Sequence, residues 1–531
     1  MMDSYDYIIV GAGSAGCVIA NRLVRAGHIV LLLESGKNDQ DYFMKIPGGL
    51  QKISASHSWS FSTEPQPFVN DRRIFMKQGR VVGGGSSING MVYIRGQAED
   101  YDDWERDGCE GWGWQNVLPV FKKLEANQRY SEPYHGTEGE LNVSDANYRH
   151  PLSYAFVRAA QEAGLPYNDD FNGSSQAGVG FYQVTCADGL RRSAASAFLR
   201  SVEKNPQLTI RSSTHVERIL TADGAASGVR YRASDNSVHE SAARQEVIIA
   251  AGAFGSPQLL QLSGIGPGAL LSRHDIDPVR VLDGVGANFH DHFQASVYGQ
   301  TKRAISLHGA DKGLRAAGHG LQWLLFKSGL LTSNIVESGG FASTRGTARP
   351  DVQFTVLPVL TGDADRTALP GHGISIGVCD LRPRARGSVQ IASKDVAVPP
   401  LIDANALGDA EDMATLVRGV RLARRILHSP SLARLLSHEL QPGRGEVDLS
   451  DAVIEEHIRR VLKTNYHPAG TCRMGRADDP NAVVDTKLRV HGVPRLRVAD
   501  ASIMPTLVSG NTNAPAIMIG ERCANFILNQ A

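Results

Sequence analysis

The order of hydrophobic and polar positions near the amino terminus predicts a strand, a helix and a second strand. Residues 5–10 form a nearly continuous apolar run, which is typical of a buried strand. Residues 17–26 place three aliphatic side chains at helical spacing, so that they share one side of a helix. A second apolar run at 29–33 ends at Glu34. This alternation is that of a βαβ unit, and it favours a parallel sheet.

The same order recurs far along the chain. Residues 246–251 predict an apolar strand that ends at Gly252, and residues 256–262 predict the helix that follows it. Because this second strand–glycine–helix unit lies far from the first, we expect one nucleotide-binding domain whose segments are not contiguous.

The region from about 297 to 465 has a different pattern. We expect strands at 374–380 and 388–392 that pair antiparallel with each other, and a long helix over 412–436. The predicted fold class is α/β (α+β overall). It combines a Rossmann-like domain with a second domain built on an antiparallel sheet flanked by helices.

Length, charge and cysteine content narrow the class of protein. At 531 residues the chain is too long for one ordinary core, so two or more domains are expected. Lysine plus arginine and aspartate plus glutamate number 55 each, which leaves no long-range field for nucleic acid or an anionic membrane. The six cysteines are scattered without a CxxC pair, as in proteins of a reducing compartment. We expect neither a secretory leader nor a spanning helix, and a cytoplasmic location, with peripheral contact with the inner membrane as the alternative.

The turn after the first strand carries a dinucleotide fingerprint, residues 11–16, in its required strand–turn–helix context. Gly11 permits the tight turn, Gly13 lets the backbone approach a pyrophosphate, and Gly16 lets the helix pack closely. The free N–H groups at the start of the helix suit phosphate. Glu34 lies about 20 residues further on, where a carboxylate can accept hydrogen bonds from ribose hydroxyls.

A second glycine-rich stretch, residues 79–89, has a related use. Its three consecutive glycines let the backbone lie against a flat ring or a phosphate without a clash from Cβ. Ser86, Ser87 and Asn89 supply neutral hydrogen-bonding groups. A flexible loop is the alternative, but the apolar flanks favour a cofactor cradle.

Two polar side chains near the carboxyl terminus are candidates for chemistry. His467 can take and return a proton at neutral pH, although taken alone a structural histidine is the better interpretation. Asn511 could donate a hydrogen bond to a substrate oxygen, with turn formation as the alternative. His290 and His292 resemble a metal pair, but a third ligand is absent from the pattern and we expect no metal.

Residues 79–89 and 252–266 resemble the two signatures of the glucose–methanol–choline (GMC) family of FAD oxidoreductases, and the resemblance covers essentially the whole chain. It implies an FAD-binding domain at 1–150, 195–296 and 485–531, and a substrate-binding domain at 151–194 and 297–484. Segments such as 332–341 look most like the bacterial alcohol and choline dehydrogenases.

The resemblance also implies roles for single residues. His467 matches the active-site histidine that takes the hydroxyl proton, and Asn511 matches the second active-site position. Ile88 stands where members with covalent FAD have histidine, so FAD is expected to be non-covalent. The cofactor-binding positions given by the fingerprint, the glycine-rich turns and the resemblance are Gly11, Gly13, Ser14, Ala15, Gly16, Glu34, Trp59, Arg80, Val82, Gly84, Ser87, Asn89, Gly90, Met91, Val92, Val216, Ala251, Gly252, Asp500, Ala501, Thr512 and Asn513.

The implied reaction is oxidation of a primary alcohol to an aldehyde. A proton moves to His467 while a hydride moves to flavin N5, and the electrons then pass to a quinone-type or artificial acceptor. The first alternative is an aryl-alcohol, furfuryl-alcohol or choline oxidase that uses O₂. Asn465 weakly favours the dehydrogenase, because oxygen-using relatives often have a small apolar residue there. A remote alternative is a non-redox flavin lyase of the same fold.

The family layout places the substrate pocket at 330–341, 354–360 and 465–467. We expect apolar walls, and Glu337 as an anionic partner if the substrate is choline. The sequence does not predict an oligomeric state. The apolar wall residues expected are Leu330, Leu331, Phe341, Phe354 and Leu357.

Overall fold

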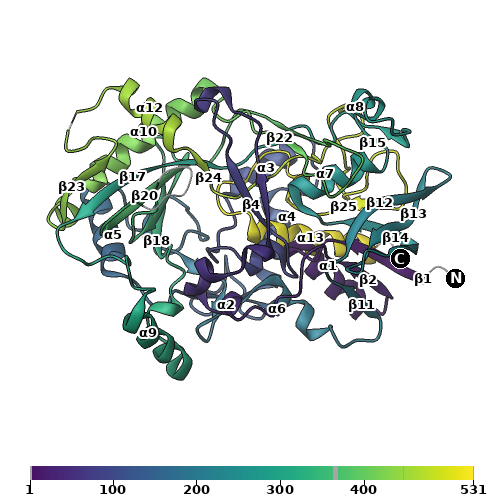
Figure 1. The fold of residues 1–531 in the computed structure, drawn as a ribbon, viewed down its shortest axis with the longest axis horizontal. Coiled ribbons are helices and arrows are strands. Elements are labelled where there is room, and N and C mark those ends of the chain that lie inside the picture. The colour runs from purple at the N-terminus through teal and green to yellow at the C-terminus, as the bar shows by residue number, and fades with distance from the viewer. Residues whose placement is uncertain (1–2, 363–368, 447, 530–531) are drawn as a thin grey trace.

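The computed structural model describes residues 3–362, 369–446 and 448–529, and these residues form two large sheets with separate hydrophobic cores. Figure 1 shows the two sheets side by side, with both chain termini at the end of the molecule that holds the first sheet.

The first sheet has a parallel part and an antiparallel part. β11, β2, β1, β14 and β25 run parallel, while β13 and β12 continue from β14 as an antiparallel meander. β2 and β25 are buried throughout, and β1 and β14 are buried at their carboxyl ends, as expected for strands covered on both faces. In sheet order the strands are β11 (Leu208–Arg211), β2 (Val30–Leu33), β1 (Asp3–Val10), β14 (Val238–Ile249), β13 (Ala225–Arg232) and β12 (His215–Ala222), with β25 (Leu496–Val498) also beside β14.

Helices from both chain ends pack on this sheet. α1 (Ser14–Arg25) follows β1, and α13 (Asn513–Leu528) lies against α1. Arg22 of α1 forms an ion pair with the buried Glu521 of α13, with Nε and Oε2 2.7 Å apart. α7 (Gly252–Leu262) begins directly after β14, which confirms the second strand–glycine–helix unit.

The second sheet is antiparallel throughout its described strands. The helices α5 (Pro151–Glu162), α10 (Ala410–Leu427) and α12 (Asp451–Val461) pack against its strands. The predicted α/β fold class is therefore confirmed, whereas the exact domain boundaries stay a prediction. In sheet order the strands are β23 (Leu436–Gln441), β17 (Phe293–Thr301), β20 (Gly373–Asp380), β19 (Val352–Leu357), β18 (Ser338–Ala342) and β7 (Gly178–Phe181), with β24 (Lys463–Thr464) beside β17.

Two sequence predictions in this region are wrong. The helix predicted over 412–436 ends at Leu427, because Pro430 lacks an amide hydrogen and interrupts the pattern. The predicted pairing of 374–380 with 388–392 does not form. β20 is already paired with β17 and β19 along its two edges, so β21 (Ser388–Gln390) pairs instead with β22 (Leu401–Asp403).

The remaining elements connect the sheets. β3 (Ser58–Ser62) and β4 (Phe75–Gly79) form an antiparallel ribbon, and α9 (Gly313–Phe326) projects from the lower edge in Figure 1. Among the described residues, no helix combines the length and apolar character needed to cross a bilayer. The other helices and strands are α2 (Tyr42–Lys45), α3 (Ala98–Arg106), α4 (Trp114–Leu124), β5 (Glu125–Asn127), β6 (Leu141–Asp145), β8 (Gln183–Val184), β9 (Cys186–Ala187), β10 (Leu190–Arg191), α6 (Ala194–Ala197), β15 (Ile265–Gly266), α8 (Gly268–Arg273), β16 (Arg280–Val281) and α11 (Pro430–Ala433).

Candidate active site

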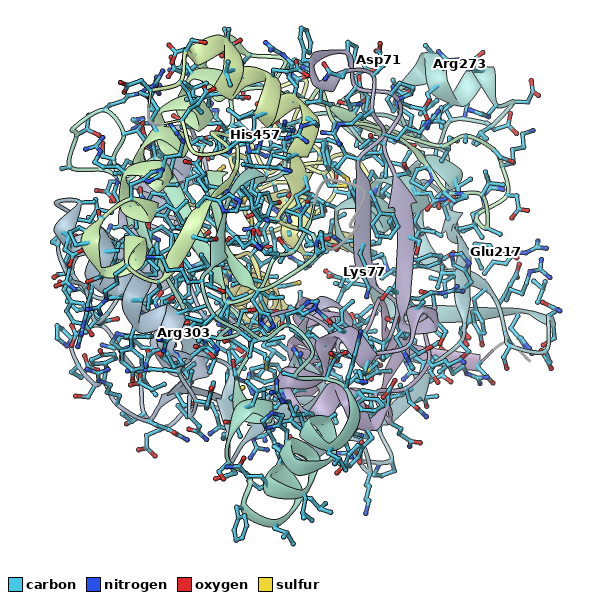
Figure 2. The ribbon with its side chains drawn as sticks, turned by 60° about the vertical axis from the view of Figure 1, so that its left-hand side comes forward. Asp71, Lys77, Glu217, Arg273, Arg303 and His457 are labelled. Atoms are coloured by element: carbon cyan, nitrogen blue, oxygen red, sulfur yellow. The ribbon has the colours of Figure 1, made fainter. Side chains whose placement is uncertain are left out.

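A cavity of about 1680 Å³ is lined by residues from both sheets. A site for one drug-sized ligand usually measures about 300–1,000 Å³, so this cavity has room for a dinucleotide and a second small molecule. Lys77 of β4 lines the cavity and lies near the centre of Figure 2, which locates it in that view.

The turn between β1 and α1 forms one wall of the cavity. Gly11 has φ +103°, and a Cβ there would lie 2.3 Å from the carbonyl oxygen of Ala250, so only glycine fits. α1 begins after Gly13 without a side-chain cap, which leaves its first N–H groups free for an anion. This geometry suits a diphosphate.

Glu34 lies at the end of β2, beside that turn. Its carboxylate accepts hydrogen bonds from the backbone N–H of Ala12 at 3.0 Å and of Gly36 at 2.8 Å. Burial raises the pKa of Glu34 to about 6, although these two hydrogen bonds oppose the shift. The carboxylate is therefore held rigidly at the cavity wall and is ionised at neutral pH.

The second glycine-rich stretch touches the first. A Cβ at Gly84, which has φ +54°, would lie 2.7 Å from Cα of Gly13. The two backbone turns are thus in van der Waals contact and form one continuous surface without side chains. A flat ring and a phosphate can approach such a surface closely.

Asn89 is oriented by a residue that the sequence reasoning missed. The Oδ1 atom of Asn89 accepts hydrogen bonds from the Met91 N–H at 3.0 Å and from Nη1 of Arg191 at 2.8 Å. Arg191 also donates to the carbonyl oxygens of Met44 and Ser86. Burial lowers the pKa of Arg191 to about 10. No local sequence pattern predicts that Arg191 lies buried behind the glycine-rich turn.

Residues from the carboxyl-terminal region complete the wall. Asp500 accepts hydrogen bonds from the Gly252 N–H at 2.8 Å and from Oγ of Ser256 at 2.6 Å, which joins the end of β25 to the start of α7. Ser14 donates to Oδ1 of Asn513 at 2.8 Å, which joins the starts of α1 and α13.

Most predicted cofactor positions meet at this cavity. Four do not line it and lie behind it instead. Gly16 packs against the Gly11 carbonyl, Ser87 donates to the Val82 carbonyl at 2.9 Å, and the Arg80 guanidinium lies 4.2 Å from the Trp59 ring centroid. Their direct contact with a cofactor, like that of the others, stays a prediction. The predicted residues that line the cavity are Gly11, Gly13, Ser14, Ala15, Glu34, Trp59, Gly84, Asn89, Gly90, Met91, Val92, Val216, Ala251, Gly252, Asp500, Ala501, Thr512 and Asn513, together with His467 and Asn511.

His467 lines the cavity and is the end of a hydrogen-bonded chain. Its Nδ1 lies 2.9 Å from Nδ1 of His292, and Nε2 of His292 lies 3.0 Å from the carbonyl oxygen of Leu381. Asp291 accepts a hydrogen bond from the His467 backbone N–H at 2.8 Å and so fixes the segment. The sequence reasoning found the His290-Asp291-His292 segment but gave His292 no role.

These partners determine the position of each proton. The Leu381 carbonyl can only accept, so Nε2 of His292 carries a hydrogen and its Nδ1 is bare. Nδ1 of His467 must then donate to His292, so its Nε2 carries no hydrogen and can act as an acceptor. The neutral imidazole therefore presents a proton acceptor on the side where His467 and Asn511 line the cavity.

Asn511 faces the same nitrogen. Its Nδ2 donates to Nε2 of His467 at 3.2 Å, and its Oδ1 accepts from Nε2 of Gln353 at 3.2 Å. Gln353 thus sets the orientation of the Asn511 amide, and the donor lies next to the acceptor. A small polar ligand at this point would meet one hydrogen-bond donor, Nδ2 of Asn511, and one acceptor, Nε2 of His467.

Burial keeps the two imidazoles of this cluster uncharged. Desolvation lowers the pKa of His467 well below its usual value, with the neighbouring His292 as a smaller cause, and lowers the pKa of His292 to about 4. Desolvation also raises the pKa of Asp291 to about 7. Both imidazoles are therefore neutral at pH 7, as the proton positions require.

The substrate-side wall is apolar, but it differs from the prediction. Leu330, Leu331 and Leu357 line the cavity as expected. Phe354 does not, because side chains alternate along β19 and Gln353 and Thr355 take the cavity side. Phe341 also lies outside the cavity wall, in a small core with Phe171 and Tyr182.

Glu337 is not available to a substrate. Its side chain is fully buried, outside the cavity wall, and accepts hydrogen bonds from Oγ of Ser153 at 2.8 Å and Oγ of Ser333 at 2.6 Å. The backbone N–H of His150 donates to it as well. The expectation that Glu337 would balance the charge of choline is therefore wrong. Within residues 3–362, 369–446 and 448–529, no three His, Cys, Asp or Glu side chains are grouped as metal ligands.

Comparisons with known proteins agree with this geometry. Residues 5–294 and 383–520 match the two family profiles described as GMC oxidoreductase. An alcohol dehydrogenase [acceptor] from Pseudomonas putida is 45% identical over 99% of this chain and 96% of that relative. The mitochondrial choline dehydrogenase of Mus musculus is 40% identical over 99% of this chain and 89% of that relative. The crystal structure of pyridoxine 4-oxidase from "Mesorbium loti" is similar with a TM-score of 0.88 and 29% identity, over 98% of each chain.

The fold and the two-walled cavity define a flavoprotein oxidoreductase. This chain belongs to the GMC oxidoreductase family. The resemblance noted in the sequence is confirmed, and with it the expectation of FAD as cofactor.

Proposed function

We propose that the protein oxidises a primary alcohol to an aldehyde with non-covalent FAD, that His467 is the base, and that the electrons pass to a quinone-type or artificial acceptor. The observation that carries the proposal is the bare Nε2 of a neutral His467 at the cavity wall, 3.2 Å from the Asn511 amide. The high identity to an alcohol dehydrogenase supports the same reaction class.

The residues present fit FAD. The free N–H groups of α1 would hold the diphosphate, and Glu34 would accept hydrogen bonds from the ribose. Gly13 and Gly84 both line the cavity, and their side-chain-free surface would lie against the cofactor. Ile88 lines the cavity with an aliphatic side chain that has no nucleophile for a covalent link.

The chain's own contribution is proton transfer and charge stabilisation. Nε2 of His467 accepts the hydroxyl proton, and the resulting imidazolium keeps its other hydrogen bond to His292. Nδ2 of Asn511 donates to the oxygen as negative charge develops there. His467 is only 7% exposed, so little water competes for either group. When bound, FAD supplies the acceptor for the hydride from the α-carbon.

An aliphatic or aromatic primary alcohol suits the cavity better than a cationic one. The walls include Ile335, Val336 and Leu360 in addition to the leucines, and Glu337 is taken up by internal hydrogen bonds. Choline is the second candidate substrate, because choline dehydrogenases are among the relatives at about 40% identity. For the acceptor, Asn465 lines the cavity two residues before His467, which favours a dehydrogenase over an oxidase.

The test is a substrate panel with wild-type enzyme and His467→Ala, at matched FAD content. We expect turnover of apolar primary alcohols with an artificial acceptor, little peroxide, and loss of at least about 100-fold in kcat for His467→Ala. His438→Ala, an exposed histidine on β23, is the matched control and should retain full activity. Turnover by His467→Ala at the wild-type rate would refute the assignment of the base. Stoichiometric peroxide would favour the oxidase, and preference for choline would favour the second substrate.

A further inference from the structure

Arg191 differs from the other buried arginines of this protein in having no acidic partner. Four arginines are buried in the part of the chain that the structure describes, and three of them form an ion pair with a glutamate, as a buried charge usually does. Arg191 forms no such pair within the described residues, and its Nη2 atom is buried without a hydrogen-bond partner there. The three pairs are Arg95 with Glu125, Arg424 with Glu439, and Arg497 with Glu246.

The three groups that hold Arg191 are all uncharged. Its Nε donates to the Met44 carbonyl at 2.9 Å, and its Nη1 donates to the Ser86 carbonyl at 3.1 Å and to Oδ1 of Asn89 at 2.8 Å. Burial lowers the pKa of Arg191 only to about 10, so the guanidinium is still ionised at neutral pH. The protein therefore keeps a desolvated positive charge that no described carboxylate balances.

This charge lies directly behind the cavity wall. Arg191 itself, at the end of β10, does not line the cavity, whereas Asn89 does. Oδ1 of Asn89 accepts hydrogen bonds from Arg191 and from the Met91 N–H, and its Nδ2 donates to none of the described residues. The amide is therefore fixed with a free donor for a ligand. The guanidinium charge and the amide dipole both favour negative charge in the cavity beside Asn89.

A ligand that gains negative charge would be the missing partner, and FAD is such a ligand. Its ring system is uncharged when oxidised. A hydride brings two electrons and one proton, so the ring gains one negative charge, while the alcohol that gives up the hydride also loses its hydroxyl proton to a base and becomes an aldehyde.

The diphosphate of FAD is the other candidate anion. The free N–H groups at the start of α1 already suit it. The contacts of Arg191 are with Met44, Ser86 and Asn89 rather than with the turn at residues 11–16, which favours the ring over the diphosphate.

We propose that the positive charge of Arg191 raises the reduction potential of bound FAD, and that Arg191 positions Asn89 as a donor to the ring. Reduction brings the negative charge that the buried guanidinium lacks, so the protein stabilises the reduced cofactor more than the oxidised one. The inference takes from the proposed function only the position of the ring beside Asn89.

The experiment is a measurement of the reduction potential of FAD in the holoenzyme, with xanthine and xanthine oxidase as the reductant and a reference dye in the same solution. Arg191→Gln keeps an amide donor but removes the charge. At a given potential we expect its ratio of reduced to oxidised FAD to fall about tenfold or more, which is a downward shift of about 30 mV for two electrons. Arg191→Lys keeps the charge and should retain most of the wild-type potential. The matched control is Arg192→Gln, since Arg192 is partly exposed and paired with Asp188 at 3.1 Å, and its potential should equal that of wild type.

A second pair of variants tests the charge without changing Arg191. Cys186 is directly opposite Arg191 in the pairing of β9 with β10, so a carboxylate there would lie beside the guanidinium. Cys186→Asp adds the missing counter-ion, whereas Cys186→Asn has the same shape without the charge. The potential of Cys186→Asp should be the lower of the two, and this comparison decides the question if Arg191→Gln does not fold.

Three results would overturn the proposal. One is a wild-type potential in Arg191→Gln, and weaker FAD binding in that variant would then assign the charge to the diphosphate. Another is an equal fall in Arg191→Lys and Arg191→Gln, because the hydrogen bonds rather than the charge would then set the potential. The third is equal potentials in Cys186→Asp and Cys186→Asn. Turnover of a primary alcohol by the wild-type enzyme tests the proposed function separately, since the reductive titration contains no alcohol.

Discussion

The hydrogen bond between His292 and His467 predicts that His292 is a positioning residue for the base. Substitution His292→Leu removes the acceptor that lies 2.9 Å from Nδ1 of His467. Asparagine has nearly the same shape as leucine, but in His292→Asn its Oδ1 can accept the hydrogen bond from Nδ1 of His467 in place of the lost nitrogen. The pair therefore separates the hydrogen bond from the packing.

The size of the effect follows from burial. Both imidazoles are almost inaccessible to water, so His292→Leu leaves a buried N–H donor without a partner. Leaving such a donor without a partner costs about 1–3 kcal/mol. If this cost disfavours the reactive tautomer of His467, the rate falls about 5- to 150-fold. The imidazole can escape the cost by moving its proton to Nε2, but that tautomer has no lone pair for the substrate. The imidazolium formed during the reaction would lose the same partner.

The assay is steady-state turnover of a primary alcohol with an artificial acceptor, after FAD content has been matched by absorbance. We expect His292→Leu to lower kcat while KM changes little, and His292→Asn to recover most of kcat. Equal losses in both variants, with FAD bound in both, would refute the argument about proton position. Wild-type kcat in His292→Leu would show that the chain of hydrogen bonds has no part in catalysis.

Four further outcomes can be measured. Glu34→Gln should weaken FAD binding about tenfold or more in a fluorescence titration, since it removes a carboxylate that two backbone N–H groups hold in place. Gly84→Val should yield protein without flavin absorbance, because a Cβ there meets backbone at 2.7 Å, whereas Gly318→Ala, which is outside the cavity wall and has open space around its Cβ, should bind FAD normally. Asn511→Leu should lower kcat about 100-fold by removing the donor to the developing charge, and KM should change less. The folded-state pKa of His292 is about 4 rather than 6.5, so the unfolded chain binds more protons between these values and stability falls as pH falls. Urea unfolding of His292→Asn between pH 6.5 and 5 should show a slope smaller by about 1 kcal/mol per pH unit, and an unchanged slope would contradict the shift.

Local patterns predicted the parts of the fold that depend on neighbouring residues. β1, the glycine turn at Gly11 and α1 follow one another directly, so spacing alone identified them. The strand before Gly252 was found in the same way. The partners of β20 were not predictable from local pattern, because one of its edges is taken by β17, which lies more than 70 residues earlier, and the other by β19.

Contacts between residues distant in sequence also limited the prediction of the site. His467 and Asn511 were found because they lie in short distinctive segments, although their roles stay predictions. Arg191 and His292 were missed as contributors, since each acts through a residue more than 100 positions away. Phe354 was misplaced because the alternation of side chains along β19 turns it into the core. Glu337 was misplaced because its hydrogen bonds to neighbouring residues keep it inside the protein, away from the cavity.

Ser14 and Asn513 are 499 positions apart in sequence, yet they are hydrogen-bonded at the rim of one cavity. A nascent polypeptide cannot offer a finished binding cleft until α13 has left the ribosome and docked on α1. The complete binding site therefore forms only in chains that contain α13. Chains truncated before α13 should lack the stabilisation that a bound ligand gives the native state, and should therefore be degraded by proteases more readily.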